Sequence, residues 1–232
     1  MTAHSTTTQG KGLALTLIST IGIIVVVVAL FVYTMTQPRV LSVKELVSNG
    51  AITYEKPVVI KPFALIDHNG AAFTPERLKG HWTLMFFGFS NCGDFCPTTL
   101  ALLNQFAQQL KPDIADKTQV VMVSVDPHRD TPARLQEYMT TFNKDFIGVT
   151  GELSPIKALA DQLYISFPMS HSMPNSMSHA TGEGEHYDVT HGEQIVLINP
   201  EGDYHGFFKP PFTLARLKTT YQSIVVTYDH NH

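Results

Sequence analysis

The hydrophobic positions divide the chain into one uninterrupted apolar run and a longer part in which short apolar runs alternate with amphipathic segments. Residues 13–35 carry no charged side chain. Because about 20 apolar residues span a bilayer, this run predicts a transmembrane anchor over 13–35, preceded by a polar tail over 1–12. A cleaved signal peptide would have an apolar core of roughly 7–15 residues followed by small residues, and residues 34–38 offer no such cleavage site.

The segment after the anchor mixes polar and apolar positions. Residues 36–56 are predicted to form a stalk with one short helix over 42–47, and the compact domain is expected over 57–232. These roughly 170 residues suffice for one hydrophobic core and are too few for two comfortable ones.

Within this domain, period-two and buried apolar runs alternate with helical periodicity, as in βαβ folds. Turns are expected at 67–70 and at 199–202, where Pro and Gly occupy positions that suit a type I turn. The order of elements, βαβ, helix, ββα, predicts an α/β fold of the thioredoxin-like class with N-terminal β additions. The expected strands are 58–60, 63–66, 82–89, 120–125, 146–149, 195–198 and 203–208, and the expected helices run over 97–110 and 213–228 and begin at Thr131 and Ser154.

The two cysteines of the chain, Cys92 and Cys96, lie where the buried strand 82–89 turns into a helix. Pro97 suits the first turn of that helix. Since a residue before proline is displaced from the α region, Cys96 is expected as the cap and Cys92 in the preceding loop. The field at the helix N-terminus would then favour both thiolates.

A thiol pair at this spacing can exchange electrons as a disulfide or hold a metal ion. Three residues separate the cysteines, a wider loop than the two of thioredoxin, and this leaves both chemistries open. A structural disulfide is the weakest alternative, because a bridge over so short a loop constrains little of the unfolded chain.

Charge excludes one class of partner and leaves the topology undecided. A net charge of −4 with 16 Lys and Arg and no basic cluster argues against a nucleic-acid surface. Lys11 flanks one side of the anchor, and Arg39 and Lys44 flank the other, so the positive-inside rule gives no orientation.

Three separated motifs resemble those of the Sco/SenC family. They are FFGFSNCGDFCPTTL at 86–100, VSVDPHRDTP at 123–132 and DVTH at 188–191. Members of that family are membrane-anchored thioredoxin-like proteins that deliver copper during assembly of the binuclear copper site of cytochrome c oxidase. The resemblance runs from the anchor to about Tyr221, nearly the whole chain.

The resemblance implies a copper site made of Cys92, Cys96 and the distant His191. Soft thiolates suit Cu(I), and an added imidazole also lets Cu(II) bind. It further implies two partners, the copper-site subunit of cytochrome c oxidase and an upstream copper donor, and a domain facing the periplasm or the mitochondrial intermembrane space. The chain departs from the family at Asn91, where a His is frequent, and at Gly93, where a Pro is usual.

Two other functions remain open. A thiol:disulfide oxidoreductase that reduces the cysteines of the oxidase copper site would use Cys92 or Cys96 as nucleophile and would not need His191 as a ligand. A peroxiredoxin-like peroxidase is disfavoured, because neither cysteine lies in the Pro-x-x-x-Thr-x-x-Cys context typical of those enzymes.

Two further groups of residues carry candidate chemistry. A long stretch over 165–188 contains soft ligands, which suit an auxiliary copper site, although a mobile Ser-rich loop is the more ordinary interpretation; these ligands are Met169, His171, Met173, Met177 and His179. For the acidic motif, Asp126, Arg129 and Asp130 are expected to serve turn and cap chemistry, with Asp130 or Thr131 capping the next helix.

Overall fold

The computed structural model describes residues 8–36, 40–166 and 193–231 of the 232-residue chain. The chain divides into two compact units, Met1–Val40 and Leu41–His232. The first unit contains helix α1 (Thr8–Thr36), and its segment Thr16–Met35 is long and apolar enough to cross a membrane. A helix of this kind is therefore present where the sequence predicts an anchor.

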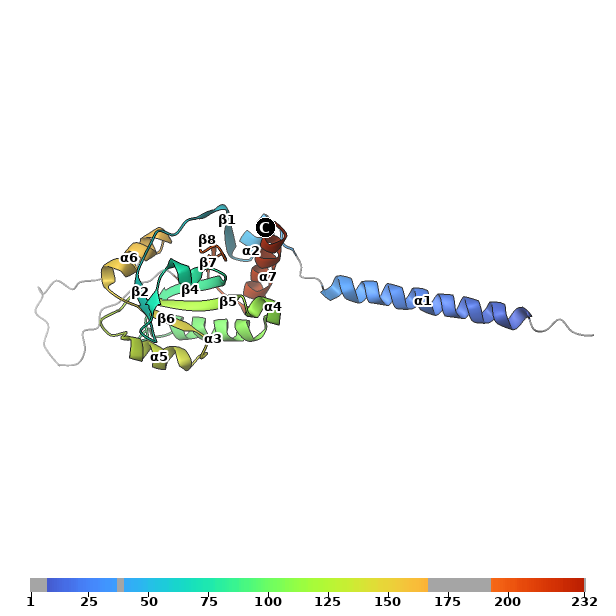
Figure 1. Cartoon of the computed structure of the whole chain (residues 1–232), viewed down its shortest axis with the longest axis horizontal. Helices are drawn as coiled ribbons and strands as arrows, with labels where there is room; N and C mark the ends of the chain where they lie inside the picture. The colour runs from blue at the N-terminus through green and yellow to red at the C-terminus, as the bar shows by residue number, and fades with distance from the viewer. Residues whose placement is uncertain (1–7, 37–39, 167–192, 232) are drawn as a thin grey trace, which may run out of the picture. The chain divides into compact units, whose positions relative to one another are not determined.

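The second unit is built around an eight-stranded mixed sheet with the order β1-β8-β7-β4-β5-β6-β2-β3 (Figure 1). The strands are β1 (Ala51–Val58), β2 (Leu65–Asp67), β3 (Ala72–Phe73), β4 (Trp82–Gly88), β5 (Thr118–Ser124), β6 (Ile147–Thr150), β7 (Ile195–Ile198) and β8 (Tyr204–Phe208). The helices are α2 (Val43–Ser48), the 3-10 helix η1 (Pro75–Leu78), α3 (Phe95–Gln108), α4 (Pro112–Ala115), α5 (Pro132–Thr140), α6 (Leu153–Gln162) and α7 (Leu214–Asn231).

Strand β4 lies in the middle of the sheet, and all seven of its residues are buried. Because side chains alternate between the faces of a strand, Phe86 packs into one hydrophobic cluster and Phe87 into another. The Phe86 cluster includes residues of α3, α5 and α7, whereas the Phe87 cluster includes residues of α6. Figure 1 shows α3 and α5 along one face of the sheet and α6 on the other.

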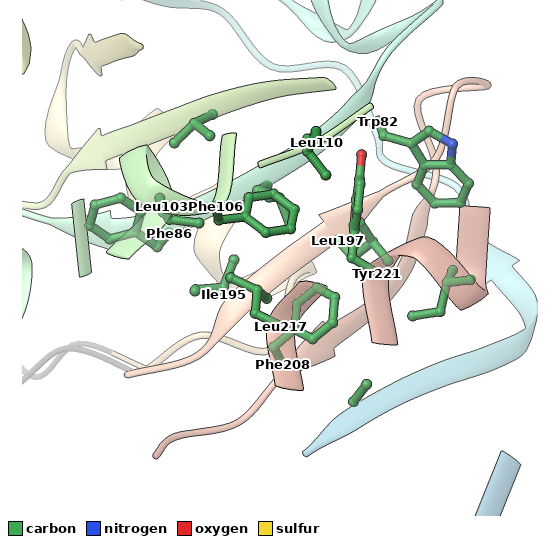
Figure 2. Packing of buried hydrophobic residues seen from close by; sticks show 14 of the residues in the cluster. Trp82, Phe86, Leu103, Phe106, Leu110, Ile195, Leu197, Phe208, Leu217 and Tyr221 are labelled. Carbon is green, nitrogen blue, oxygen red and sulfur yellow. The ribbon is translucent and has the colours of Figure 1, made fainter. Parts of the chain in front are cut away.

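Aromatic rings fill the cluster on the Phe86 face (Figure 2). The ring of Tyr221 on α7 lies 5.1 Å from that of Phe106 on α3 and 6.4 Å from that of Trp82 on β4, both edge-on. Edge-to-face pairs of this kind stabilise a core beyond the area they bury. They fix α3 and α7 against the same face of the central strand.

Strand direction determines where the chemistry can lie. Strands β4, β5 and β6 are parallel, while β7 is antiparallel to β4. Gly88 at the end of β4 pairs with Ser124 at the end of β5. The segments that follow these two strands therefore emerge at the same edge of the sheet, which is the edge where parallel α/β sheets place their functional residues.

Most elements predicted from the sequence are present, with one clear difference at the N-terminal side of the domain. The compact unit begins at Leu41, earlier than the start near Pro57 expected from the sequence, because Leu41 and Leu46 are buried in the Phe86 cluster. Strand β1 begins at Ala51, which pairs with Phe208 of β8. The mixed charge of residues 51–56 reflects an edge strand and not a stalk.

Candidate functional site

Both cysteines lie just beyond the end of β4. Cys92 is half-buried in the loop after the strand, and Cys96 is fully buried in the first turn of α3. The N-cap of α3 is Asp94 and not Cys96, so the cap predicted from Pro97 is wrong. Burial of the Cys96 side chain in the Phe86 cluster outweighs the local preference of a residue that precedes proline.

The two residues contact each other through the start of the helix. The backbone N–H of Cys96 donates to Sγ of Cys92 at 3.4 Å, while Asp94 makes no side-chain cap hydrogen bond. A helix leaves its first N–H groups without intrahelical partners, and here a sulfur accepts one of them. The two cysteines are not joined by a disulfide bond, and they are held so that one ion or one disulfide bond can engage both.

The sulfur of Cys96 lies directly over the end of β4. A Cβ atom added to Gly88 would meet Cys96 Sγ at 2.6 Å and the ring of Phe86 at 3.1 Å. Real Cβ atoms do not approach other atoms so closely, so glycine is required at this position for the sulfur to occupy its place. The motif residue Gly88 thus shapes the site without contributing a ligand.

Burial changes the acidity of this thiol. Burial raises the pKa of Cys96, and a backbone hydrogen bond from Phe89 opposes that effect, while the neighbouring Cys92 and Asp130 add to it. The sequence predicted that the helix field would favour both thiolates. For Cys96 the desolvation of a buried anion is the larger effect, and it favours the protonated thiol.

A buried carboxylate fixes the loop that leads to Cys92. Asp130 is fully buried and accepts hydrogen bonds from Ser90 N at 2.9 Å, Ser90 Oγ at 2.5 Å and Ser124 Oγ at 2.6 Å. Ser124 ends β5 and Ser90 follows β4, so one side chain joins the ends of both parallel strands. This network holds the backbone two residues before Cys92.

The rest of the acidic motif serves the local structure predicted for it. Thr131 is the N-cap of α5, and its side chain accepts the N–H of Arg134 at 3.3 Å. Asp126 is buried and pairs with Arg129. The prediction of turn and cap chemistry is therefore confirmed for these residues but misses the role of Asp130, which binds across 40 positions of sequence to Ser90.

The third ligand implied by the family resemblance lies outside the described residues. His191 is not described, and neither are Met169, His171, Met173, Met177 and His179. Across residues 8–36, 40–166 and 193–231, no group of three or more His, Cys, Asp or Glu side chains is gathered as a metal site. Glu193 is the first described residue after this segment, and β7 follows it. Because β7 runs antiparallel to β4, β7 starts at the edge of the sheet that carries the cysteines.

Two residues that shape the site were not predicted to do so. Gly88 acts through packing, and Asp130 acts through hydrogen bonds. Ser90 and Ser124 follow or end two neighbouring parallel strands, but nothing in the sequence alone joins them to Asp130.

Comparisons with known proteins agree on one family. The family model described as SCO1/SenC matches residues 52–225. A SCO2-like protein of Rickettsia prowazekii is 35% identical over 156 residues, which cover 67% of this chain and 72% of the relative. Among solved structures, Arabidopsis thaliana ScoI with copper bound has a TM-score of 0.63 at 29% identity and covers 73% of this chain and 100% of its own. Yeast Sco1 with copper bound has a TM-score of 0.61 at 28% identity, with 76% and 91% covered.

Proposed function

The chain belongs to the SCO1/SenC family, and on that premise we propose that it is a membrane-anchored copper metallochaperone for cytochrome c oxidase. Proteins of the Sco family bind copper and take part in assembly of that oxidase. The observation that carries the proposal is the contact of the two cysteines at the start of α3, where Cys96 N–H donates to Cys92 Sγ at 3.4 Å. In this account copper is the cargo and the oxidase copper site is its destination.

The proposed ligands are Cys92, Cys96 and His191. Two thiolates give the soft donor set that Cu(I) prefers, and a histidine extends the site to Cu(II). His191 is two residues before Glu193 in the sequence, and the described chain from Glu193 enters β7 at the edge of the sheet that carries the cysteines, which supports the inclusion of His191. The burial of Cys96 favours a site whose affinity depends on pH, because binding must release the thiol proton.

The unequal exposure of the two sulfurs suits a site that gives its cargo away. Cys96 is fully buried against Gly88, whereas Cys92 is half-buried in a loop that also contains the exposed Gly93. An incoming ligand of the acceptor reaches the ion from the Cys92 side, and Cys96 is the last ligand to be released. Ligand exchange of this kind moves the ion without leaving it free in water.

A transfer assay tests the proposal. The full chain in detergent micelles is loaded with copper and mixed with the reduced copper-site domain of the oxidase, and the absorption of the binuclear centre is followed. The proposal predicts transfer by the wild-type chain and none by the Cys96→Ser variant. If the acceptor remains copper-free with the wild-type chain, the delivery function is refuted.

The same thiol contact also favours a second function, a thiol:disulfide oxidoreductase. Here one thiolate of the pair attacks a disulfide of the oxidase copper site, and a mixed disulfide forms. The other cysteine then resolves it, so that the pair is oxidised to a disulfide while the target gains two electrons and two protons. His191→Ala separates the two functions, because it weakens Cu(II) binding and leaves dithiol exchange intact.

We assign the domain to the outer side of the inner membrane, facing the periplasm, or to the intermembrane space in a mitochondrion. The helix over Thr16–Met35 supports single-pass anchoring. Protease added to spheroplasts is expected to digest the domain, with a cytoplasmic protein as the protected control. Digestion that requires rupture of the inner membrane contradicts this topology.

A further inference from the structure

Tyr138 of α5 carries a buried polar atom for which the structure shows no hydrogen-bond partner within the described ranges. Its ring packs edge-on against Phe142 with centroids 5.3 Å apart, and it contacts the Phe86 cluster that also contains Cys96. A buried hydroxyl without a partner costs about 1–3 kcal/mol. Such a group requires an explanation, and a ligand-dependent partner is one.

Two helices that start from the same edge of the sheet bring Tyr138 and Cys96 to one hydrophobic cluster. Helices α3 and α5 both start from the edge where β4 and β5 end, and Asn143 Nδ2 donates to Asn104 Oδ1 at 3.0 Å. Asn143 follows the end of α5 at Thr140, and Asn104 lies in α3, so this bond holds the two elements side by side.

Long side chains on a helix lean toward its N-terminus, so the side chain of Tyr138 extends toward the edge of the sheet from which α3 also starts. The electrostatics agree with this geometry. Burial raises the pKa of Tyr138, and Cys96, Cys92 and Asp130 add to the effect in that order. The phenol therefore remains a neutral O–H donor beside the thiol pair.

Cys96 is a sulfur for which an added donor matters. Its side chain is fully buried, and burial disfavours the thiolate by raising the pKa of Cys96. A backbone hydrogen bond from Phe89 partly offsets this effect. Hydrogen bonds to an ionised acceptor are roughly twice as strong as neutral ones. In the metal-free thiol the gain from such a bond is small, and in a metal-bound thiolate it is large.

We propose that the hydroxyl of Tyr138 donates a hydrogen bond to Sγ of Cys96 when copper holds that sulfur as a thiolate. This inference rests on the proposed copper site and adds an outer-sphere residue to it. The bond lowers the energy of the sulfur lone pair, strengthens retention of copper and shifts the sulfur-to-Cu(II) charge-transfer band to higher energy. Without copper, the hydroxyl is a cost to the fold.

The test replaces the hydroxyl alone. Tyr138→Phe keeps the ring contact with Phe142, and Tyr164→Phe is the matched control because Tyr164 is 69% exposed. Both variants and the wild-type full chain are compared for Cu(I) affinity by chelator competition, for the Cu(II) charge-transfer band and for thermal stability of the reduced, metal-free form.

Opposite effects on the two forms are the signature of the proposed bond. Tyr138→Phe is expected to weaken copper binding about tenfold, to move the charge-transfer band to longer wavelength and to leave metal-free stability unchanged or higher. Tyr164→Phe is expected to match the wild type. An unchanged affinity and band in Tyr138→Phe, or a less stable metal-free form, overturns the inference and leaves the proposed function standing. A wild-type chain that binds no copper overturns the proposed function, and this inference with it.

Discussion

The sulfur of Cys96 occupies the space that a side chain at Gly88 would fill. A Cβ atom at Gly88 would lie 2.6 Å from Cys96 Sγ. The last residue of the central strand and the first turn of the next helix are therefore packed as one unit. The position of Cys96, a proposed copper ligand, is expected to depend on this contact, and so is the stability of the domain.

Gly88→Ala is expected to displace Cys96 and weaken copper binding at least tenfold, because the added methyl group takes the place of the sulfur. Overpacking of this kind also costs about 1–3 kcal/mol of folding free energy. Urea denaturation of the metal-free chain and chelator competition for Cu(I) measure the two effects.

Gly93→Ala is the matched control for this substitution. A Cβ at Gly93 meets no atom within 4 Å, although the residue lies between the two cysteines. Gly93→Ala is therefore expected to leave both the folding stability and the Cu(I) affinity within error of the wild type. If Gly93→Ala and Gly88→Ala behave alike, the contact between Gly88 and Cys96 does not set the geometry of the site.

Asp130→Asn is expected to destabilise the domain by about 2 kcal/mol, because an amide cannot accept all three hydrogen bonds and leaves a buried donor unsatisfied. Ser124→Ala removes one of these bonds and is expected to cost about 1 kcal/mol. Chemical denaturation of the reduced chain measures both losses of folding free energy.

Copper affinity separates the two variants further. Asp130→Asn loosens Ser90 and with it the loop to Cys92, whereas Ser124→Ala leaves both bonds between Asp130 and Ser90 in place. The affinity is therefore expected to fall in the first variant and not in the second. Equal affinities in both would show that the network supports the fold without positioning the ligand loop.

Because of His68, the metal-free chain is expected to lose stability in mild acid. The buried ring of His68 accepts the N–H of Gly148 through Nδ1 at 2.8 Å, and burial lowers its pKa below the ordinary 6.5, with Asp67 opposing. The unfolded chain therefore binds a proton at higher pH than the folded chain does. The contribution of neutral His68 is complete above pH 6.5 and is lost as the pH falls below that value.

Thermal unfolding of the metal-free chain between pH 7.5 and 5 measures this contribution. His68→Asn is expected to unfold with a weaker dependence on pH, since asparagine has no titratable group in this range. His81→Asn, at an exposed position, should retain the wild-type dependence. A wild-type melting temperature that does not fall below pH 6.5 refutes the role given to His68.

The fold and the cysteine pair were predictable because their signals are local. The apolar run over β4, the turn that follows it and the proline at the start of α3 lie within a few residues of one another, and they place Cys92 and Cys96 at the strand-to-helix junction. Three motifs in order then indicate the family. Local periodicity also gave the hairpin of β7 and β8, which the structure confirms.

The details of the site were not predictable in the same way, because they depend on residues far apart in the sequence. Asp130 binds Ser90 across 40 positions, and no local pattern distinguishes such an acceptor from a helix cap. Cys96 was expected as a cap from its proline neighbour, but burial against Gly88 determined its place. Tertiary packing overrides local preference at both positions.

The central claim is a copper site of two sulfurs and one imidazole. Its most direct test is X-ray absorption spectroscopy of the full chain loaded with one equivalent of Cu(I), with His191→Ala as the comparison. The account predicts two copper–sulfur contacts near 2.3 Å, by analogy with metal–thiolate bonds of about that length, and one nitrogen contact that disappears in His191→Ala. Loss of copper from both proteins during isolation, or an identical nitrogen contact in the variant, would contradict it.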